Sequence, residues 1–222
     1  MANPSKARQE PRWERRKDAR PEQITAAALD LFVERGYAAT RLEDVAERAG
    51  VSKGTVYLYF ANKAELLKAV VREGIVSPLS EARSLIEQYQ GSIFDLLGRL
   101  IRQWWTRIGA TSLSGIPKLM IAEARNFPDI AEFYLTEVIE PMNAAVRRLI
   151  ERGIESGEFR QVDVVQMATL VSAPLLMLAL WRNSLGCCRP STQDPTKLLD
   201  THLDTLRAAL LIEGTGAPRS KP

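Results

Sequence analysis

Residues 40–63 read TRLEDVAERAGVSKGTVYLYFANK, and this stretch decides the fold of the N-terminal part of the chain. Thr40, followed three residues later by Glu43, has the pattern of a capping box, so we expect a short helix that begins near Arg41. The apolar residues of this helix recur at helical spacing on one face, at Leu42, Val45, Ala46 and Ala49. The stretch therefore opens with a short amphipathic helix.

A tight turn and a second short helix follow. Gly50 offers the left-handed backbone conformation that ends a helix, and Ser52 can cap a helix over residues 53–60. Ala46 supplies a small residue where two steeply crossing helices approach each other. The stretch is a helix-turn-helix, whose second helix fits the major groove of B-DNA with its N-terminal residues nearest the base edges.

The outward positions of this motif give the expected DNA contacts. Lys53, Gly54 and Thr55 open the second helix, two tyrosines face outward from it, and a lysine at the next helix start is placed for a phosphate. The alternative is a compact helical hairpin with no role in DNA binding. The DNA-binding set that we expect is Thr40, Arg41, Ser52, Lys53, Gly54, Thr55, Tyr57, Tyr59 and Lys63. We assign the acidic Glu43 to capping rather than to a base contact.

Across residues 21–70 the chain resembles the TetR family of bacterial transcriptional regulators. The resemblance rests on Leu31-Phe32, Gly36-Tyr37, Thr40, Ala46, Gly50-Val51-Ser52 and Tyr57-Leu58-Tyr59-Phe60-Ala61-Asn62-Lys63. It implies an all-helical homodimer with an N-terminal three-helix DNA-binding head and a C-terminal domain that binds a small effector. Double-stranded DNA, a second copy of the chain and a small molecule are thus the implied partners, and no cofactor is implied.

The rest of the chain has helical rather than strand periodicity, so the predicted fold class is all-α. We expect a basic arm at 1–20, a helix-turn-helix domain at 21–66, a helical effector-binding and dimerisation domain at 67–213, and a tail at 214–222. Turn-forming residues divide the larger domain into six helical segments. These are 79–89, 92–110, 116–125, 128–156, 163–184 and 196–212.

The positive charge of the chain is concentrated near its N-terminus. Residues 1–64 hold 12 Lys+Arg against 9 Asp+Glu, whereas residues 65–222 hold 18 of each. The first twenty residues hold 7 against 3, which fits either an arm that contacts phosphates or a minor groove, or a solvated tail. They also lack the apolar core of a secretory signal, so we expect a cytoplasmic protein.

Segment 163–184 carries no charge between Asp163 and Arg182. A membrane span is the alternative, but the run is at the lower length limit and contains several polar residues and Pro174. A helix this apolar in a soluble protein needs cover on most of its sides. We therefore predict that 163–184 packs with 196–212 and with the same two helices of a second copy.

Large apolar side chains in the C-terminal domain are the candidates for an effector pocket, although most of them would serve equally well as plain core. Few polar groups accompany them, which favours a hydrophobic effector; Glu123 and Arg125 are either polar anchors for it or solvated surface residues. The expected ligand-binding set is Trp104, Trp105, Met120, Phe127, Tyr134, Met177 and Trp181, with Met142 as a further candidate.

Nothing in the sequence favours an enzyme. The single histidine, His202, is expected on the charged side of the last helix, and no catalytic motif or metal-ligand spacing is present. The predicted function is a ligand-responsive repressor that binds a palindromic operator as a homodimer. The alternatives are a sequence-independent architectural DNA-binding protein, whose charge would normally be higher, and a thiol- or metal-responsive regulator using Cys187 and Cys188.

Overall fold

The computed structural model describes residues 20–188 and 194–212, and within them the chain is all-α, as predicted. No strand occurs in these ranges, and an isolated bridge between Phe159 and Leu211 is their only β pairing. The chain divides at Val70 and Val71 into an N-terminal unit, here called the head, and a C-terminal unit. Residues 1–19 of the predicted arm and the predicted tail lie outside the described residues, and Arg20 begins the first helix.

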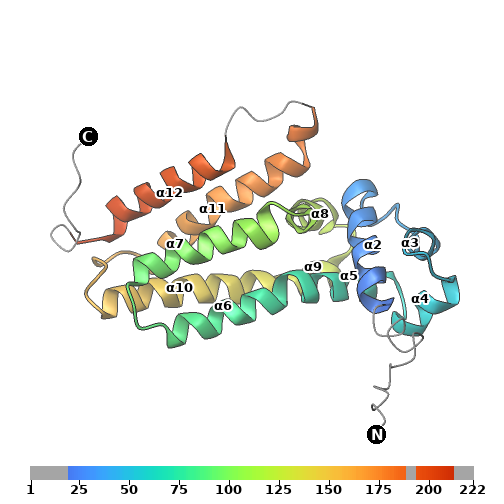
Figure 1. Ribbon diagram of the computed structural model, residues 1–222, viewed down its shortest axis with the longest axis horizontal. Helices are drawn as coiled ribbons and strands as arrows, with labels where there is room; N and C mark the ends of the chain where they lie inside the picture. The colour runs from blue at the N-terminus through green and yellow to red at the C-terminus, as the bar shows by residue number, and fades with distance from the viewer. Residues whose placement is uncertain (1–19, 189–193, 213–222) are drawn as a thin grey trace, which may run out of the picture. The chain divides into compact units, whose positions relative to one another are not determined.

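The described part of the head consists of one longer helix followed by three short ones (Figure 1). Its helices are α2 (Arg20–Arg35), α3 (Leu42–Arg48), α4 (Lys53–Tyr59) and α5 (Lys63–Val71). The apolar stripe of α2 is buried because residues three and four apart share one helix face. The fully buried side chains of the head are Ile24, Ala28, Leu31, Phe32, Val45, Val56, Leu66 and Leu67.

The start of α3 corrects the predicted capping box. Thr40 is buried, and its hydroxyl donates to the carbonyls of Leu31 (3.2 Å) and Gly36 (2.8 Å). The N-cap is Arg41 instead, and its backbone N–H donates to the Asp44 carboxylate at 3.3 Å. The carboxylate that caps α3 is therefore one residue later in the chain than predicted, because Thr40 is used to tie the end of α2 to the following turn.

The turn between α3 and α4 agrees with the prediction. Gly50 has φ of 66°, and the amide of Val51 donates to the carbonyl of Ala46 at 3.0 Å. Ser52 caps α4, since its hydroxyl accepts from the amide of Thr55 at 3.1 Å. The local helix-turn-helix geometry thus follows from one glycine in the left-handed region and one serine cap.

Replacing Gly50 by alanine is expected to lower the free energy of unfolding by about 1–2 kcal/mol, the cost of the left-handed conformation for an L residue. A Cβ at this position meets no atom within 4 Å, so steric clash adds nothing. Chemical denaturation would measure the loss. Gly54→Ala is the matched control, because Gly54 lies in α4 outside the positive-φ region and its Cβ would make only ordinary contact with Ser52. An equal loss in both variants would contradict the prediction.

The C-terminal unit confirms the predicted segments. Its α-helices are α6 (Ser77–Gln88), α7 (Ile93–Trp104), α8 (Gly115–Glu123), α9 (Pro128–Tyr134), α10 (Glu140–Glu155), α11 (Val164–Asn183) and α12 (Pro195–Leu210). Three π-helical turns join or extend these helices, at Arg72–Val76, Trp105–Gly109 and Leu135–Ile139. Short 3-10 turns occur at Ser112–Ser114 and Leu185–Cys187.

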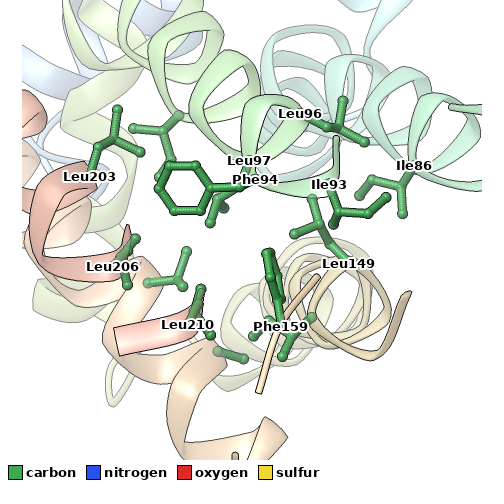
Figure 2. Packing of buried hydrophobic residues seen from close by; sticks show 14 of the residues in the cluster. Ile86, Ile93, Phe94, Leu96, Leu97, Leu149, Phe159, Leu203, Leu206 and Leu210 are labelled. Carbon is green, nitrogen blue, oxygen red and sulfur yellow. The ribbon is translucent and has the colours of Figure 1, made fainter. Parts of the chain in front are cut away.

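The main core of this unit lies between α7, α10 and α12, as Figure 2 shows. Leu199, Leu203, Leu206 and Leu210 of α12 point into it, so this helix, predicted to pack against a second copy, uses most of its leucines inside the chain. His202 is also buried, and its Nε2 lies 3.0 Å from the carbonyl oxygen of Val171. Its predicted place on the charged side of the last helix is therefore wrong, and the imidazole links α12 to α11.

Helix α11 is strongly apolar, yet much of it is exposed. It is the one helix in the described ranges that is long and apolar enough to cross a bilayer by length and composition, and only 17% of its apolar window is buried. Pro174 lies within this helix without ending it. The large apolar side chains that α11 leaves exposed are Val165, Leu170, Leu176, Met177 and Trp181. Leu170, Met177 and Trp181 lie on one side of the helix, at spacings of seven and four residues, and we call these three the α11 face.

Candidate DNA-binding face and effector cavity

The outward side of α4 carries most of the predicted DNA contacts. Lys53, Gly54 and Tyr57 are exposed, while Thr55 and Tyr59 are half-buried. The hydroxyls of Ser52 and Thr55 lie 2.8 Å apart. We retain, as a proposal, the predicted DNA-binding role of these residues and of Arg41, which is also exposed.

Leu58 belongs to the same side but was missed by the sequence reasoning. It is 73% exposed in the middle of α4. An apolar residue between other apolar residues of a short helix is usually assigned to the core, which is why it was passed over. An exposed aliphatic side chain at this place is suited to contact a thymine methyl group in the major groove.

Lys53 does not stand alone on this surface. Its ammonium forms an ion pair with Glu43 of α3 and lies 5.7 Å from the ring centroid of Tyr57. The hydrogen bond from Lys53 lowers the pKa of Glu43, and the same bond raises the pKa of Lys53. Glu43 is therefore a partner of the first residue of α4, and its predicted capping role is wrong.

The ammonium of Lys63, which was predicted to face a DNA phosphate, is bound to backbone carbonyls of the head instead. Its ammonium donates to the carbonyls of Tyr37 (2.7 Å), Ala38 (3.1 Å) and Thr40 (2.9 Å), and lies 4.4 Å from the Tyr37 ring centroid. An ammonium has three donors, so these carbonyls use all of them. We therefore replace the phosphate role of Lys63 by a positioning role, in which it holds the turn between α2 and α3 against the start of α5. The hydroxyl of Thr40 is likewise buried and committed inside the head.

A Lys63→Met variant is expected to lower the free energy of unfolding by about 1–3 kcal/mol, because charge-assisted hydrogen bonds to the turn are lost. Methionine retains most of the apolar stem, so the effect reports on the ammonium. Chemical denaturation provides the measurement, and Lys68→Met is the control, since Lys68 donates to Glu65 at 3.0 Å within α5. If Lys63→Met costs no more than Lys68→Met, the positioning role is wrong.

The second candidate site is a cavity of about 560 Å³ in the C-terminal unit. Its wall is formed by α6, α7, α10 and α11, with contributions from α8, the end of α9 and the π-helical turns. Most lining side chains are aliphatic or aromatic. The polar groups among them are Gln103, Arg107, Tyr134, Asn143, Thr169 and Ser172. Such a volume and such a lining are typical of a small-molecule site.

Two residues of the expected ligand-binding set, Trp104 and Tyr134, line this cavity, as does the further candidate Met142. The remaining five are not in its wall. Trp105 packs against the main core, Met120 is buried, and Phe127 precedes α9. Met177 and Trp181 belong to the α11 face. Glu123 and Arg125 also lie outside the wall, so they do not supply a polar anchor in this cavity.

The polar positions of the cavity have distinct environments. Burial raises the pKa of the Tyr134 phenol, which therefore stays neutral and able to donate a hydrogen bond. The guanidinium of Arg107 donates to the Glu81 carboxylate at 2.7 Å. Arg107 is the one charged residue in the lining, so the wall offers no carboxylate to a cationic ligand.

Each π-helical turn contributes to the cavity wall: Ile75 from the first, Arg107 and Ile108 from the second, Val138 and Ile139 from the third. The first and third are joined by a bidentate ion pair, in which the Arg72 guanidinium donates to Glu137 at 2.9 and 2.7 Å. π-Helical turns are frequent at functional sites because the extra residue re-aims the neighbouring side chains. Here they contribute four apolar side chains and Arg107 to the cavity wall.

The thiol hypothesis stays a prediction. Cys188 is exposed, and the side chain of Cys187 lies outside the described residues. Among the residues that the structure describes, no group of three or more His, Cys, Asp or Glu side chains is arranged to hold a metal ion.

Two family models match the chain, one in each unit. Residues 24–70 match the family model for bacterial regulatory proteins of the tetR family, and residues 90–185 match the model for a tetracyclin repressor-like C-terminal domain. The first match covers the helix-turn-helix, and the second covers α7 to α11, which form much of the cavity wall.

Individual relatives agree with the family models. The uncharacterized HTH-type transcriptional regulator YdeS of Bacillus subtilis is 30% identical over 156 residues, which are 68% of this chain and 74% of YdeS. SmeT, the repressor of a Stenotrophomonas maltophilia multidrug efflux pump, has in its triclosan complex a TM-score of 0.73 at 24% identity, covering 92% of this chain and 97% of SmeT. FadR of Bacillus subtilis, in complex with stearoyl-CoA, has a TM-score of 0.65 at 20% identity, covering 84% and 97%. The chain belongs to the TetR family of bacterial transcriptional regulators.

Proposed function

We propose that this protein is a ligand-responsive repressor that binds a palindromic operator as a homodimer and is released from it by a small, largely apolar effector. The observation that carries the proposal is the presence, in one chain, of an exposed reading helix and a separate apolar cavity of about 560 Å³. A cytoplasmic location goes with this function.

The reading helix supports the DNA-binding part. Tyr57 and Leu58 are exposed on α4, which leaves them available to base edges, and the exposed Lys53 beside them is paired with Glu43. A seven-residue helix contacts few bases, so high specificity requires two heads on a twofold axis.

The α11 face supports the homodimer. Helix α12 lies beside α11, and the two are linked by His202 and Val171 (Figure 1). Leu170, Met177 and Trp181 are spaced by seven and four residues and so share one side of α11. An exposed apolar strip of this kind marks an interface. A second copy that packs its own α11 and α12 on the strip would make a four-helix contact.

The cavity supports the effector class. Its apolar wall favours an elongated or aromatic hydrocarbon body, and Tyr134, Gln103 and Asn143 offer hydrogen bonds to one polar end. The single charged residue, Arg107, favours a neutral or anionic end over a cationic one. The apolar phenol triclosan in SmeT and the acyl chain of stearoyl-CoA in FadR have this chemistry.

Coupling between the two sites is proposed to run through the chain itself. Helix α5 of the head ends at Val71 and continues directly into the π-helical turn at Arg72–Val76, whose Ile75 lines the cavity. An effector that displaces Ile75 would disturb this turn, and the disturbance would change the direction in which α5 enters it. A coupling of about 1–3 kcal/mol changes operator affinity roughly 5- to 150-fold, which is enough for a switch.

Selection of duplexes from a random library tests the function. The protein is expected to enrich a palindrome, to lose affinity for it when Tyr57 is replaced by alanine, and to release it when triclosan or long-chain fatty acids are added. An affinity that is equal for the palindrome and for random duplexes at two salt concentrations would instead favour the architectural DNA-binding protein. Release by oxidants alone, abolished by serine at Cys187 and Cys188, would favour the thiol-responsive regulator.

A further inference from the structure

The cations of the head are almost all neutralised by acceptors within the head. Residues 20–70 contain seven Lys+Arg and seven Asp+Glu, so this part of the chain has no net charge. Of the cations whose side chains the structure describes here, Arg41 is the one with no ion pair or carbonyl partner among the described residues. The pairs are Arg35 with Asp44, Arg48 with Glu34, Lys53 with Glu43, Lys68 with Glu65, and Lys63 with three carbonyls.

The pair of Lys53 and Glu43 is placed differently from the others. Lys53 is the first residue of α4, the helix that reads DNA, and Glu43 lies in the first turn of α3. Their side chains are 56% and 49% exposed, so water and ions reach both. A phosphate that approaches α4 therefore meets Lys53 already bound to a carboxylate, and it must displace that carboxylate to gain the contact.

Non-specific affinity for DNA depends on how many phosphates a protein neutralises, since each contact releases condensed counterions. A lysine that stays paired with a carboxylate adds no such contact. At a specific site the base contacts of α4 hold the helix close to the backbone, and the exchange of carboxylate for phosphate then becomes favourable. An intramolecular carboxylate at this position weakens binding to random sequence more than binding to the operator.

We propose that Glu43 is a specificity-determining residue of the head, which competes with DNA phosphates for Lys53 and so suppresses binding to non-operator DNA. The proposal rests on the DNA-binding function proposed above. Glu43 acts through Lys53, and it is a positioning residue rather than a base-reading one. The lowered pKa of Glu43, caused first by its hydrogen bond with Lys53, agrees with this arrangement, because the carboxylate stays charged to a lower pH than that of an ordinary glutamate.

The test uses the full-length protein and a fluorescein-labelled 30-base-pair duplex of random sequence, titrated at several KCl concentrations. Glu43→Gln is expected to bind this duplex roughly 3- to 30-fold more tightly, because each head of a dimer gains a phosphate contact. The slope of log affinity against log salt should become steeper by about 1 to 2. On a palindrome selected with the wild-type protein the gain should be several-fold smaller, so the specificity ratio falls.

Two variants separate release of Lys53 from a general change in charge. Glu47→Gln removes an equal charge from an exposed position of α3 that has no ion pair among the described residues, and its slope should stay that of the wild type. The double variant Glu43→Gln/Lys53→Gln removes the whole pair at unchanged net charge, and it should return to the wild-type slope.

Three results would overturn the proposal: a Glu43→Gln slope equal to that of the wild type, an equal steepening in Glu47→Gln, or a steepening that persists in the double variant. A wild-type protein that binds neither duplex at low salt would refute the DNA-binding function, and the proposal with it. A thermal melt of each variant shows whether the head is intact, and an exposed pair is expected to change it little.

Discussion

A Met177→Asp variant is expected to be monomeric and to bind the selected palindrome at least about 100-fold more weakly than the wild type. Met177 is 61% exposed at the centre of the α11 face, between Leu170 and Trp181. In a symmetric dimer both copies would place the new carboxylate in an apolar contact without a partner, which opposes association. Loss of the dimer removes one of the two heads and with it most of the specific affinity.

Sedimentation velocity and palindrome titration together measure this effect. Because Met177 is exposed, the substitution should leave the fold of the monomer intact, which circular dichroism would show. Gln88→Asp adds the same charge at an exposed position of α6 and is the matched control. A Met177→Asp protein that still sediments as a dimer would refute the α11 face as the interface.

Local interactions made the head predictable from the sequence. The turn at Gly50 and the cap at Ser52 involve residues a few positions apart, so the residue types alone indicate the geometry. Which residue caps α3 was harder to predict, because two carboxylates, Glu43 and Asp44, follow each other in its first turn. Thr40 with Glu43 and Arg41 with Asp44 have the same spacing, and the choice depends on the hydrogen bonds of Thr40 to the carbonyls of Leu31 in α2 and of Gly36 just after it.

Contacts between distant parts of the chain were not predictable in this way. Lys63 reaches carbonyls 23 to 26 residues earlier in the chain, and no local pattern indicates that a lysine at a helix start will turn back toward them. His202 shows the same limit, because its burial depends on how α12 is rotated against α11. Sequence periodicity describes one helix at a time, whereas these roles depend on its neighbour.

Two adjacent tryptophans near the cavity also have roles that depend on the neighbouring helices. Trp104 lines the cavity and Trp105 packs against the main core, although the sequence treats them alike. Successive residues of a helix point about 100° apart, so adjacent residues face different neighbours. The sequence predicted that apolar and aromatic residues of this domain would form a pocket. The wall itself depended on the packing of α6, α7, α10 and α11.

An Ala82→Trp variant is expected to keep its affinity for the palindrome and to lose release by the effector. Ala82 belongs to α6 and lines the cavity, so an indole at this position would occupy space that a ligand needs. Overpacking usually costs about 1–3 kcal/mol, but an open cavity accommodates added atoms with less strain than a filled core. The head is not altered, and DNA binding in the absence of effector should therefore be unchanged.

Calorimetric titration with triclosan or a long-chain fatty acid, whichever releases the wild-type protein, is expected to show at least a tenfold loss of affinity in Ala82→Trp. The same concentration of ligand should then leave the variant on the palindrome, because a ligand shifts the equilibrium only by its differential affinity for the two states. Ala122→Trp places the same side chain on an exposed position of α8 outside the cavity wall, and it should respond like the wild type. If the ligand released Ala82→Trp from the palindrome as readily as it releases the wild type, the effector would have to act at another site, since the indole leaves no room for it in the cavity.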